Sequence, residues 1–255
     1  MDIDHRIIQR FERTSGLSFG EFPEQGILVC ASEARTDEPK NRLLIEKVTG
    51  RDGVLVTGIP RIISDVKDYV ESMTDRELFS PLGIAEISRV LSPGDAESLD
   101  KTYYHSYAIV HREDFRPVIP RHEVTELRKK DLPHEQYELR MGERRTFEKD
   151  DFTWAFACYD DSPGFKATEL AVFGKNCAAI SVIFWEDKDD IAGFGVYIEE
   201  PFRGQGYALD TVSTATRWVL DQGGIAWYGV YADNIPSIRI ARRLGYSLVY
   251  QSFGA

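Results

Sequence analysis

The sequence predicts a mixed α/β (α+β) fold in which a mostly antiparallel sheet is flanked by helices. Two observations support this prediction. Apolar runs of strand length alternate with helix-like segments along the 255-residue chain. In its last quarter, an apolar run, a glycine-rich loop and an amphipathic segment follow one another. A chain of this length can form one large domain or two smaller ones, each with a substantial core.

The first half of the chain has an α/β rhythm without a recognisable phosphate-binding loop. Apolar stretches of strand length predict strands, and amphipathic runs predict helices. The predicted strands cover Gly26–Ser32, Arg42–Val48, Gly53–Gly58 and Tyr103–His111, and the predicted helices cover Ser64–Met73 and Pro81–Leu91. This pattern alone does not decide whether the first half is a degenerate copy of the second or a separate cap.

A basic, proline-containing stretch from Arg116 to Arg121 marks the expected boundary between the halves. Prolines interrupt both helices and central strands, so they are common between domains. We therefore expect an N-terminal α/β domain over residues 1–118 and a second domain over residues 119–255.

The second half opens with a predicted strand, Glu123–Arg128, and with Asp131, which can cap a helix ahead of Pro133. Three apolar runs follow, separated in part by short polar turns. They cover Ala167–Phe173, Cys177–Trp185 and Ile191–Glu199. This arrangement is typical of an antiparallel meander.

The six residues Arg203–Ala208 join the last of these runs to an amphipathic helix. Glycines let the backbone approach an anion closely, and the first N–H groups of a helix point at it with the positive end of the helix dipole. The next apolar residues fall at i, i+4, i+7 and i+11 and form one helix face: Ala208, Val212, Ala215 and Val219. The junction is typical of a phosphate site, although such turns also occur for packing alone.

Another strand and a short helix complete the pattern. The apolar run Ile225–Tyr231 predicts a strand, and Asn234–Ser237 starts a helix that ends near Gly245. Pro236 suits the first helical turn, and Gly245 suits the C-terminal cap.

From about residue 122 onward the chain resembles the GNAT superfamily of acyl-CoA-dependent N-acetyltransferases. Its signature Arg/Gln-x-x-Gly-x-Gly/Ala, at the start of the third helix, is matched by Arg203, Gly206 and Ala208. A second signature, Asn-x-x-Ser/Ala followed by a helix and Leu-Gly-Phe/Tyr, is matched by Asn234, Ser237 and 244–246. The two signatures stand in the family's order and separation. The resemblance implies a GNAT-like domain here, and it raises the alternative that the first half is a degenerate GNAT-like copy.

The resemblance also implies acetyl-CoA as cosubstrate. Its pyrophosphate would be held mainly by the backbone amides of Arg203, Gly204, Gln205, Gly206, Tyr207 and Ala208. The pantetheine arm would enter where the strand that ends at Tyr197 and Ile198 splays from the strand Ile225–Tyr231, and amides near Ile198 would polarise the thioester oxygen. Asn234 and Ser237 would face the cofactor arm. For each of them the alternative role is to order the start of the following helix.

Acetyl transfer to an amine needs a base near the end of the same strand, because the amine must lose a proton. Glu199 is the candidate, with a solvated surface acid as the alternative. The family commonly protonates the departing thiolate with a tyrosine seven residues after the asparagine, where this chain has Ala241. Ser237 and Tyr231 are candidate substitutes, and core packing is the alternative role for Tyr231. Unaided departure is also open, because a thiol with a pKa near ~8.5 is a tolerable leaving group.

Composition restricts partners and location. A net charge of −11 argues against nucleic acids and anionic membrane surfaces and permits a cationic substrate. The cysteines Cys30, Cys158 and Cys177 are widely separated, which favours buried core roles in a reducing compartment. No histidine or cysteine spacing indicates a metal site. We expect a cytoplasmic protein that acts on a small-molecule or peptide amine without a metal, nucleic acid or membrane; a homodimer is left open.

Three functions remain open at this point. The first is an N-acetyltransferase that works by direct transfer, and the second is a noncatalytic acyl-CoA sensor or scaffold, for which Ala241 is the reason. The third is a different nucleotide-binding α/β protein. The chain lacks Gly-Lys-Ser/Thr after the loop and lacks Gly-x-Gly-x-x-Gly, which argues against P-loop and dinucleotide-binding proteins.

Overall fold

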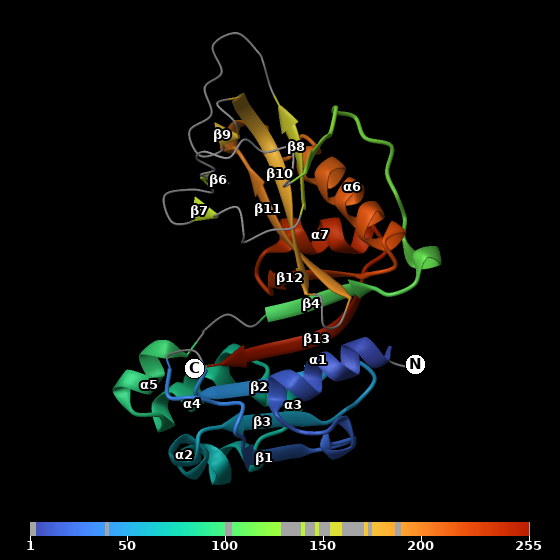
Figure 1. Ribbon diagram of the computed structural model, residues 1–255. Helices are drawn as coiled ribbons and strands as arrows, with labels where there is room; N and C mark the ends of the chain where they lie inside the picture. The colour runs from blue at the N-terminus through green and yellow to red at the C-terminus, as the bar shows by residue number, and fades with distance from the viewer. Residues whose placement is uncertain are drawn as a thin grey trace. The chain divides into compact units, whose positions relative to one another are not determined.

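The computed structural model describes residues 4–38, 41–99, 104–128, 139–140, 146–147, 154–159, 171–172, 175–186 and 190–254. These residues form mixed α/β structure with mostly antiparallel strands flanked by helices, so the predicted fold class is confirmed (Figure 1). The chain divides into two compact units. The first contains Met1–Tyr107, Gly229–Ile235 and Leu248–Ala255, and the second contains Ala108–Tyr228 and Pro236–Ser247.

The two units do not follow the chain in order, because two C-terminal segments belong to the first unit. The strands β4 (Tyr104–Ile109) and β12 (Ile225–Tyr231) each contribute residues to both units. The single boundary between residues 118 and 119 remains a prediction.

In the first unit, strands run in the order β1, β3, β2, β13. Their bounds are Ile27–Ala31 for β1, Val54–Gly58 for β3, Leu43–Val48 for β2 and Ser247–Gly254 for β13. β1 and β3 are parallel, whereas β2 is antiparallel to both β3 and β13. The strands predicted over residues 26–58 are confirmed, whereas β13 was not expected.

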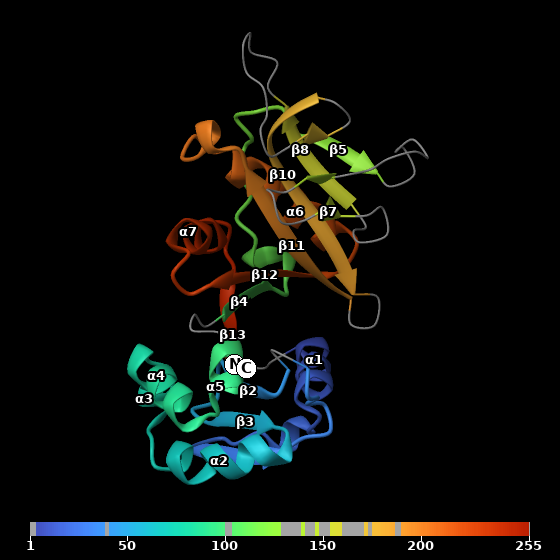
Figure 2. The ribbon, with the colours of Figure 1, turned by 90° about the vertical axis from the view of Figure 1, so that its left-hand side faces the viewer.

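Helices cover both faces of this sheet (Figure 2). On one face, α1 (His5–Ser15) packs the ring of Phe11 against Tyr250 of β13 at a centroid distance of 4.9 Å. On the other face, α2 (Pro60–Glu71) and α4 (Pro81–Val90) bury Val66, Ile87 and their neighbours against the strands. The expected helix start at Ser64 was wrong, because Pro60 already occupies the first helical position, where its missing N–H needs no partner.

The shorter helices of the first unit were not predicted. They are η1 (Phe19–Glu21), α3 (Asp75–Leu78) and α5 (Pro93–Ser98). α1 was also missed, although its signals are present. The side chain of Asp4 accepts a hydrogen bond from the Arg6 N–H at 2.9 Å, and Gly16 ends the helix at φ +74°.

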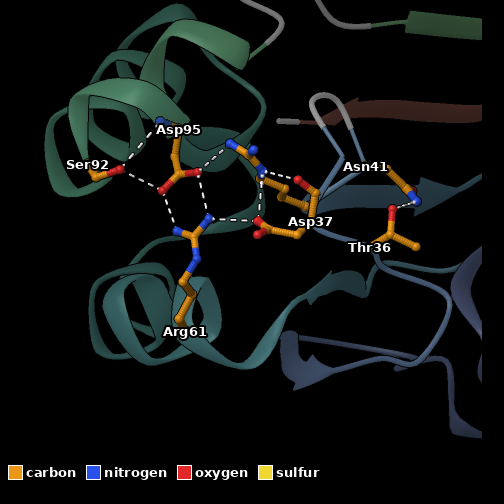
Figure 3. A network of polar contacts seen from close by, with 7 residues as sticks. Thr36, Asp37, Asn41, Arg61, Ser92 and Asp95 are labelled. Carbon is orange, nitrogen blue, oxygen red and sulfur yellow. Dashed lines mark hydrogen bonds and ion pairs between the residues drawn. The ribbon is translucent and has the colours of Figure 1, made fainter.

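A buried carboxylate ties several of these elements together (Figure 3). Asp95 of α5 is 2% exposed and accepts hydrogen bonds from Arg42 at 2.9 Å and from Arg61 at 2.5 and 3.1 Å. The hydroxyl of Ser92 donates a further bond at 2.6 Å. Arg61 holds the pKa of Asp95 well below its usual range, so the carboxylate stays charged and links the starts of α2, α5 and β2.

A second buried carboxyl lies on the opposite face of the sheet, beneath α1. Glu46 of β2 is fully buried, and its Oε1 accepts a hydrogen bond from the Tyr250 hydroxyl at 2.5 Å. Within the described residues, its Oε2 has no hydrogen-bond partner. Burial raises the pKa of Glu46 to about 7, despite the opposing effects of Tyr250 and Arg35.

Glu46 therefore makes stability depend on pH. Its pKa rises from 4.5 to about 7 on folding, so the folded state binds the proton more tightly and is destabilised as pH rises through this interval. The unfolding free energy of Glu46→Gln, measured relative to that of wild type, is expected to increase by about 3 kcal/mol as pH rises from about 4.5 to about 8. Urea unfolding across this range measures the difference. Glu33→Gln, at an exposed position, is the control. If the difference in unfolding free energy between Glu46→Gln and wild type did not change with pH, the prediction would be wrong.

The second unit is built on a long antiparallel pair. β10 (Lys175–Glu186) lies between β8 (Trp154–Tyr159) and β11 (Ile191–Ile198) and is antiparallel to both. This confirms the strands predicted near residues 177–185 and 191–199. β5 (Thr125–Arg128) pairs with β8 and confirms the predicted strand 123–128, whereas β8 itself was not expected. The helix α6 (Tyr207–Asp221) packs against β8, β10 and β11.

Smaller elements complete the described part of the chain. They are η2 (Arg112–Asp114), β6 (Leu139–Arg140), β7 (Thr146–Phe147), β9 (Ala171–Val172), η4 (Glu200–Phe202) and α7 (Ile235–Arg243). The helix start predicted at Asp131 and most of the strand predicted over 167–173 lie outside the described residues. No helix in the described ranges is both long enough and apolar enough to cross a bilayer.

Candidate functional site

The glycine loop between η4 and α6 has the conformation expected of an anion-binding turn. Gly204 and Gly206 both adopt left-handed backbone, at φ +75° and +101°, which side-chain-bearing residues rarely adopt. A Cβ atom placed on Gly204 would meet nothing within 4 Å, and one on Gly206 would meet only His122 Cε1 at 3.9 Å. The loop backbone is thus open at the point where the first N–H groups of α6 lack helical partners.

The helix behind the loop is firmly held. All four residues of its predicted apolar face, Ala208, Val212, Ala215 and Val219, are buried. Polar side chains are buried on this helix too. The hydroxyl of Ser181 on β10 donates to Thr211 Oγ1 at 2.8 Å, and Thr216 Oγ1 donates to the Val212 carbonyl at 2.7 Å. A helix packed in this way provides a rigid base for the loop.

β11 separates from β12, as the family resemblance implies. Their parallel register pairs run from Ile191↔Ile225 to Gly193↔Trp227, whereas β11 itself continues to Ile198. Along Phe194–Ile198, β11 keeps its antiparallel partner β10 on its other side. One edge of β11 near Tyr197 and Ile198 therefore carries backbone groups that can pair with an extended ligand.

Glu199 follows β11 and is buried, with an exposed fraction of 1%. Its N–H donates to the Ala178 carbonyl at 3.0 Å, and its carbonyl accepts from the Phe202 N–H at 2.9 Å. The alternative of a solvated surface acid is therefore wrong for Glu199, although it fits the exposed Glu200. The role of Glu199 as a base remains a prediction.

The thiols near this region are unsuited to covalent chemistry. Cys158 and Cys177 are free and fully buried, as expected. Burial raises the pKa of each thiol to about 12, with Asp210 adding to the effect at Cys158 and Glu199 at Cys177. In the described part of the chain, no group of three histidine, cysteine or acidic residues is arranged to hold a metal ion.

Near the end of α7, a buried alanine occupies the position where the family commonly has a tyrosine. Ala241 is fully buried, and Tyr246, just after the helix, donates or accepts a hydrogen bond with Thr216 at 2.6 Å. Burial raises the pKa of Tyr246 far above its usual value, so this phenol is a structural group. The predicted C-terminal cap is confirmed by Gly245 at φ +93°. Ser237, half-buried on α7, remains a candidate proton donor.

Two predicted site residues belong to the first unit. Tyr231 is 45% exposed, so core packing is wrong for it; its ring meets Tyr104 edge-on at 5.1 Å. The N–H of Asn234 donates to the Tyr231 carbonyl at 3.0 Å. Their roles toward a cofactor remain predictions.

Sequence reasoning missed two residues beside the loop, His122 and Asp210. Asp210 is 2% exposed in the first turn of α6 and bonds to His122. Asp210 falls on the side of the helix opposite the apolar face, where an exposed charge is the ordinary expectation, so no signal in the sequence indicates its burial. No local pattern identified His122, because its partner lies 88 residues away.

Comparisons with known proteins give one family match. A family model described as an acetyltransferase (GNAT) domain matches residues 89–247. No curated protein matches the sequence.

Several solved structures are similar. A GNAT-family putative acetyltransferase from Novosphingobium aromaticivorans is 15% identical, with a TM-score of 0.41 over 60% of this chain and 63% of that one. A GNAT-family acetyltransferase from Colwellia psychrerythraea is 15% identical, with a TM-score of 0.31 over 39% of this chain and 34% of that one. A GCN5-related N-acetyltransferase-like protein from Streptococcus suis is 13% identical, with a TM-score of 0.40 over 81% and 72%. The match spans less than two thirds of the first two proteins.

Proposed function

Because the chain belongs to the GNAT acetyltransferase family, we propose that it transfers an acetyl group from acetyl-CoA directly to a primary amine of a small molecule or peptide. The observation that carries this proposal is the open loop, with left-handed Gly204 and Gly206, at the start of α6. Backbone amides and the helix dipole at this position suit the pyrophosphate of an acyl-CoA.

The pantetheine arm would lie along the edge of β11. Its amides can hydrogen-bond as an added strand does, beyond the last register pair at Gly193. An N–H near Ile198 would then point at the thioester oxygen, where a single donor is typically worth about 3 kcal/mol in the transition state.

Direct transfer needs a sequence of proton and bond changes. Glu199 takes a proton from the ammonium group of the acceptor, and the neutral amine attacks the thioester carbonyl. The tetrahedral intermediate collapses as the C–S bond breaks, and the amine nitrogen gives up its second proton to water. The departing thiolate leaves as such or takes a proton from water or Ser237, since a thiol is a tolerable leaving group.

Glu199→Gln tests the base. The variant keeps the size of the side chain and cannot accept the proton, so kcat at neutral pH is expected to fall by about 100-fold or more with little change in acetyl-CoA affinity. Steady-state thiol release measured against pH checks this, and the acidic limb of the profile is expected to disappear.

Glu200→Gln, at the exposed neighbour, is the matched control and is expected to retain the wild-type profile. If Glu199→Gln also kept the wild-type rate and profile, Glu199 would not be the base.

A noncatalytic acyl-CoA sensor is the second candidate, favoured by one observation. The buried Ala241 stands where the family commonly has its proton-donating tyrosine. A sensor would bind acetyl-CoA without releasing thiol in the presence of any amine. Turnover with one amine would exclude it.

Location and partners belong to the same proposal. The described cysteines are free, which fits a reducing cytoplasm. A net charge of −11 favours a cationic amine over a nucleic acid or an anionic membrane.

A further inference from the structure

A histidine–aspartate pair lies at the first turn of α6, next to the glycine loop. The segment after residue 115 runs along this helix, and the Val118 N–H donates to Ser213 Oγ at 3.2 Å. Further along it, Asp210 Oδ2 accepts hydrogen bonds from the N–H groups of Arg121 at 3.0 Å and His122 at 3.1 Å. The imidazole Nδ1 of His122 lies 2.7 Å from the same oxygen.

These contacts determine the tautomer of His122. Asp210 is almost fully buried and receives two backbone donors, which is the environment of an ionised carboxylate. Nδ1 must therefore carry a proton and donate to Asp210. In the described residues, no hydrogen bond is made by the other ring nitrogen, Nε2.

The ring is held against the loop. It stacks on Tyr207, the first residue of α6, with centroids 3.5 Å apart and an interplanar angle of 18°. Its Cε1, the atom between the two nitrogens, faces the open side of Gly206 at 3.9 Å from the position of a Cβ. Nε2 is bonded to this carbon, so it too lies close to the loop.

Asp210 would by itself disfavour an anion here, because a carboxylate in the first helical turn repels a phosphate at the helix start. A protonated His122 reverses this effect, since the imidazolium neutralises Asp210 and offers Nε2–H as a second donor.

Resting on the proposed acyl-CoA binding, we propose that His122 is a further ligand of the acyl-CoA pyrophosphate, which it binds as an imidazolium so that cofactor binding takes up a proton. The Nε2–H bonds to a pyrophosphate oxygen, and Nδ1–H stays on Asp210. Nε2 gains this proton from solvent when the cofactor binds, and no other covalent bond forms or breaks. Affinity is highest when Nε2 carries its proton and is lower when it does not.

The other groups around the ring do not account for such a dependence. Asp210 and Tyr207 of α6 contact the ring. Arg121 and Glu123 flank His122 in the sequence, Arg203 belongs to the adjoining loop, and Cys158 of β8 interacts electrostatically with Asp210. Burial keeps Cys158 neutral, with a pKa of about 12. Ordinary carboxyl and guanidinium groups keep their charge between about pH 6 and pH 8, where imidazole titrates.

The test is calorimetric titration with acetyl-dephospho-CoA, whose pyrophosphate oxygens do not titrate in this range. Titrations between about pH 6 and pH 9, in pairs of buffers with different ionisation enthalpies, give the number of protons taken up. S-acetylpantetheine, which lacks the pyrophosphate, is the second probe. We expect proton uptake with the first probe and none with the second.

His122→Asn is the decisive variant, because its amide nitrogen can still donate to Asp210 from the position of Nδ1 while Nε2 and its titration are lost. We expect affinity at about pH 6 to fall roughly 10- to 100-fold and proton uptake to vanish. His111→Gln changes an exposed histidine of the same unit and is the control. If His122 had only a structural role, His122→Asn would take up as many protons on binding as wild type does.

The outcomes separate the inference from the proposed function. Binding by wild type without proton uptake, or equal uptake in His122→Asn, overturns the role of His122 and leaves acyl-CoA binding standing. No binding of acetyl-CoA or acetyl-dephospho-CoA by wild type overturns the proposed function itself.

Discussion

Replacing Gly206 with glutamate is expected to abolish acetyl-CoA binding while the fold is retained. Gly206 precedes α6 at φ +101°, and the space around a Cβ at this position is open except for His122. A glutamate side chain can therefore be accommodated, and it places a carboxylate where the helix dipole and amides would hold the pyrophosphate. Calorimetric titration is expected to show at least a 100-fold loss of affinity.

The matched control is Gly206→Ala, which introduces the same left-handed strain without the charge. This strain costs about 1–2 kcal/mol, so alanine is expected to weaken binding far less than glutamate does. Circular dichroism establishes that both variants fold. An acetyl-CoA affinity in Gly206→Glu equal to that of wild type would remove the loop from the binding site.

Deleting residues 248–255 is expected to unfold the first unit, although these residues lie far in sequence from the Met1–Tyr107 segment that makes up most of it. β13 pairs with β2 from Tyr250↔Val48 to Gly254↔Leu44. It also contributes Phe253, which is 3% exposed and meets Phe79 edge-on at 5.5 Å. Loss of a buried aromatic side chain alone typically lowers the unfolding free energy by about 3–5 kcal/mol, and loss of the backbone hydrogen bonds between β13 and β2 lowers it further. Hydrogen exchange is expected to show loss of protection in β2 and β3.

A milder variant keeps this prediction testable if the truncated chain aggregates. Phe253→Ala is expected to lower the unfolding free energy by about 3–5 kcal/mol. Leu82→Ala removes an apolar side chain that is 68% exposed in the same unit and is expected to change it by less than about 0.5 kcal/mol. Similar effects of both substitutions, or retained protection after the deletion, would show that β13 is dispensable.

Local patterns in the sequence predicted the part of the fold that positions the loop. The residues of the apolar face of α6 recur with the period of a helix, and all four of them are buried. Gly206 and Gly245 occupy left-handed positions at a helix start and a helix end, where few other residues fit. Such features depend on neighbours a few residues away, so they can be read without the tertiary structure.

Long-range contacts could not be predicted in the same way. One strand that pairs with β13 is β2, about 200 residues earlier, and no local pattern encodes this pairing. Glu199 was weighed as a surface acid because glutamate is rarely buried, whereas the chain around it buries the side chain. His122 became a candidate only through its contacts with Asp210 and Tyr207. The burial of Glu46 likewise depends on α1 and Tyr250, which are distant from it in sequence.

Acceptor-dependent release of CoA thiol from acetyl-CoA tests the central claim most directly. The purified protein is incubated with acetyl-CoA and a panel of polyamines, aminoglycosides and lysine-containing peptides, with Gly206→Glu as the inactive control. The account predicts thiol release with at least one amine, an equal amount of acetylated amine by mass spectrometry, and neither product with Gly206→Glu. Binding of acetyl-CoA without amine-dependent thiol release across the panel would contradict acetyl transfer and favour the sensor.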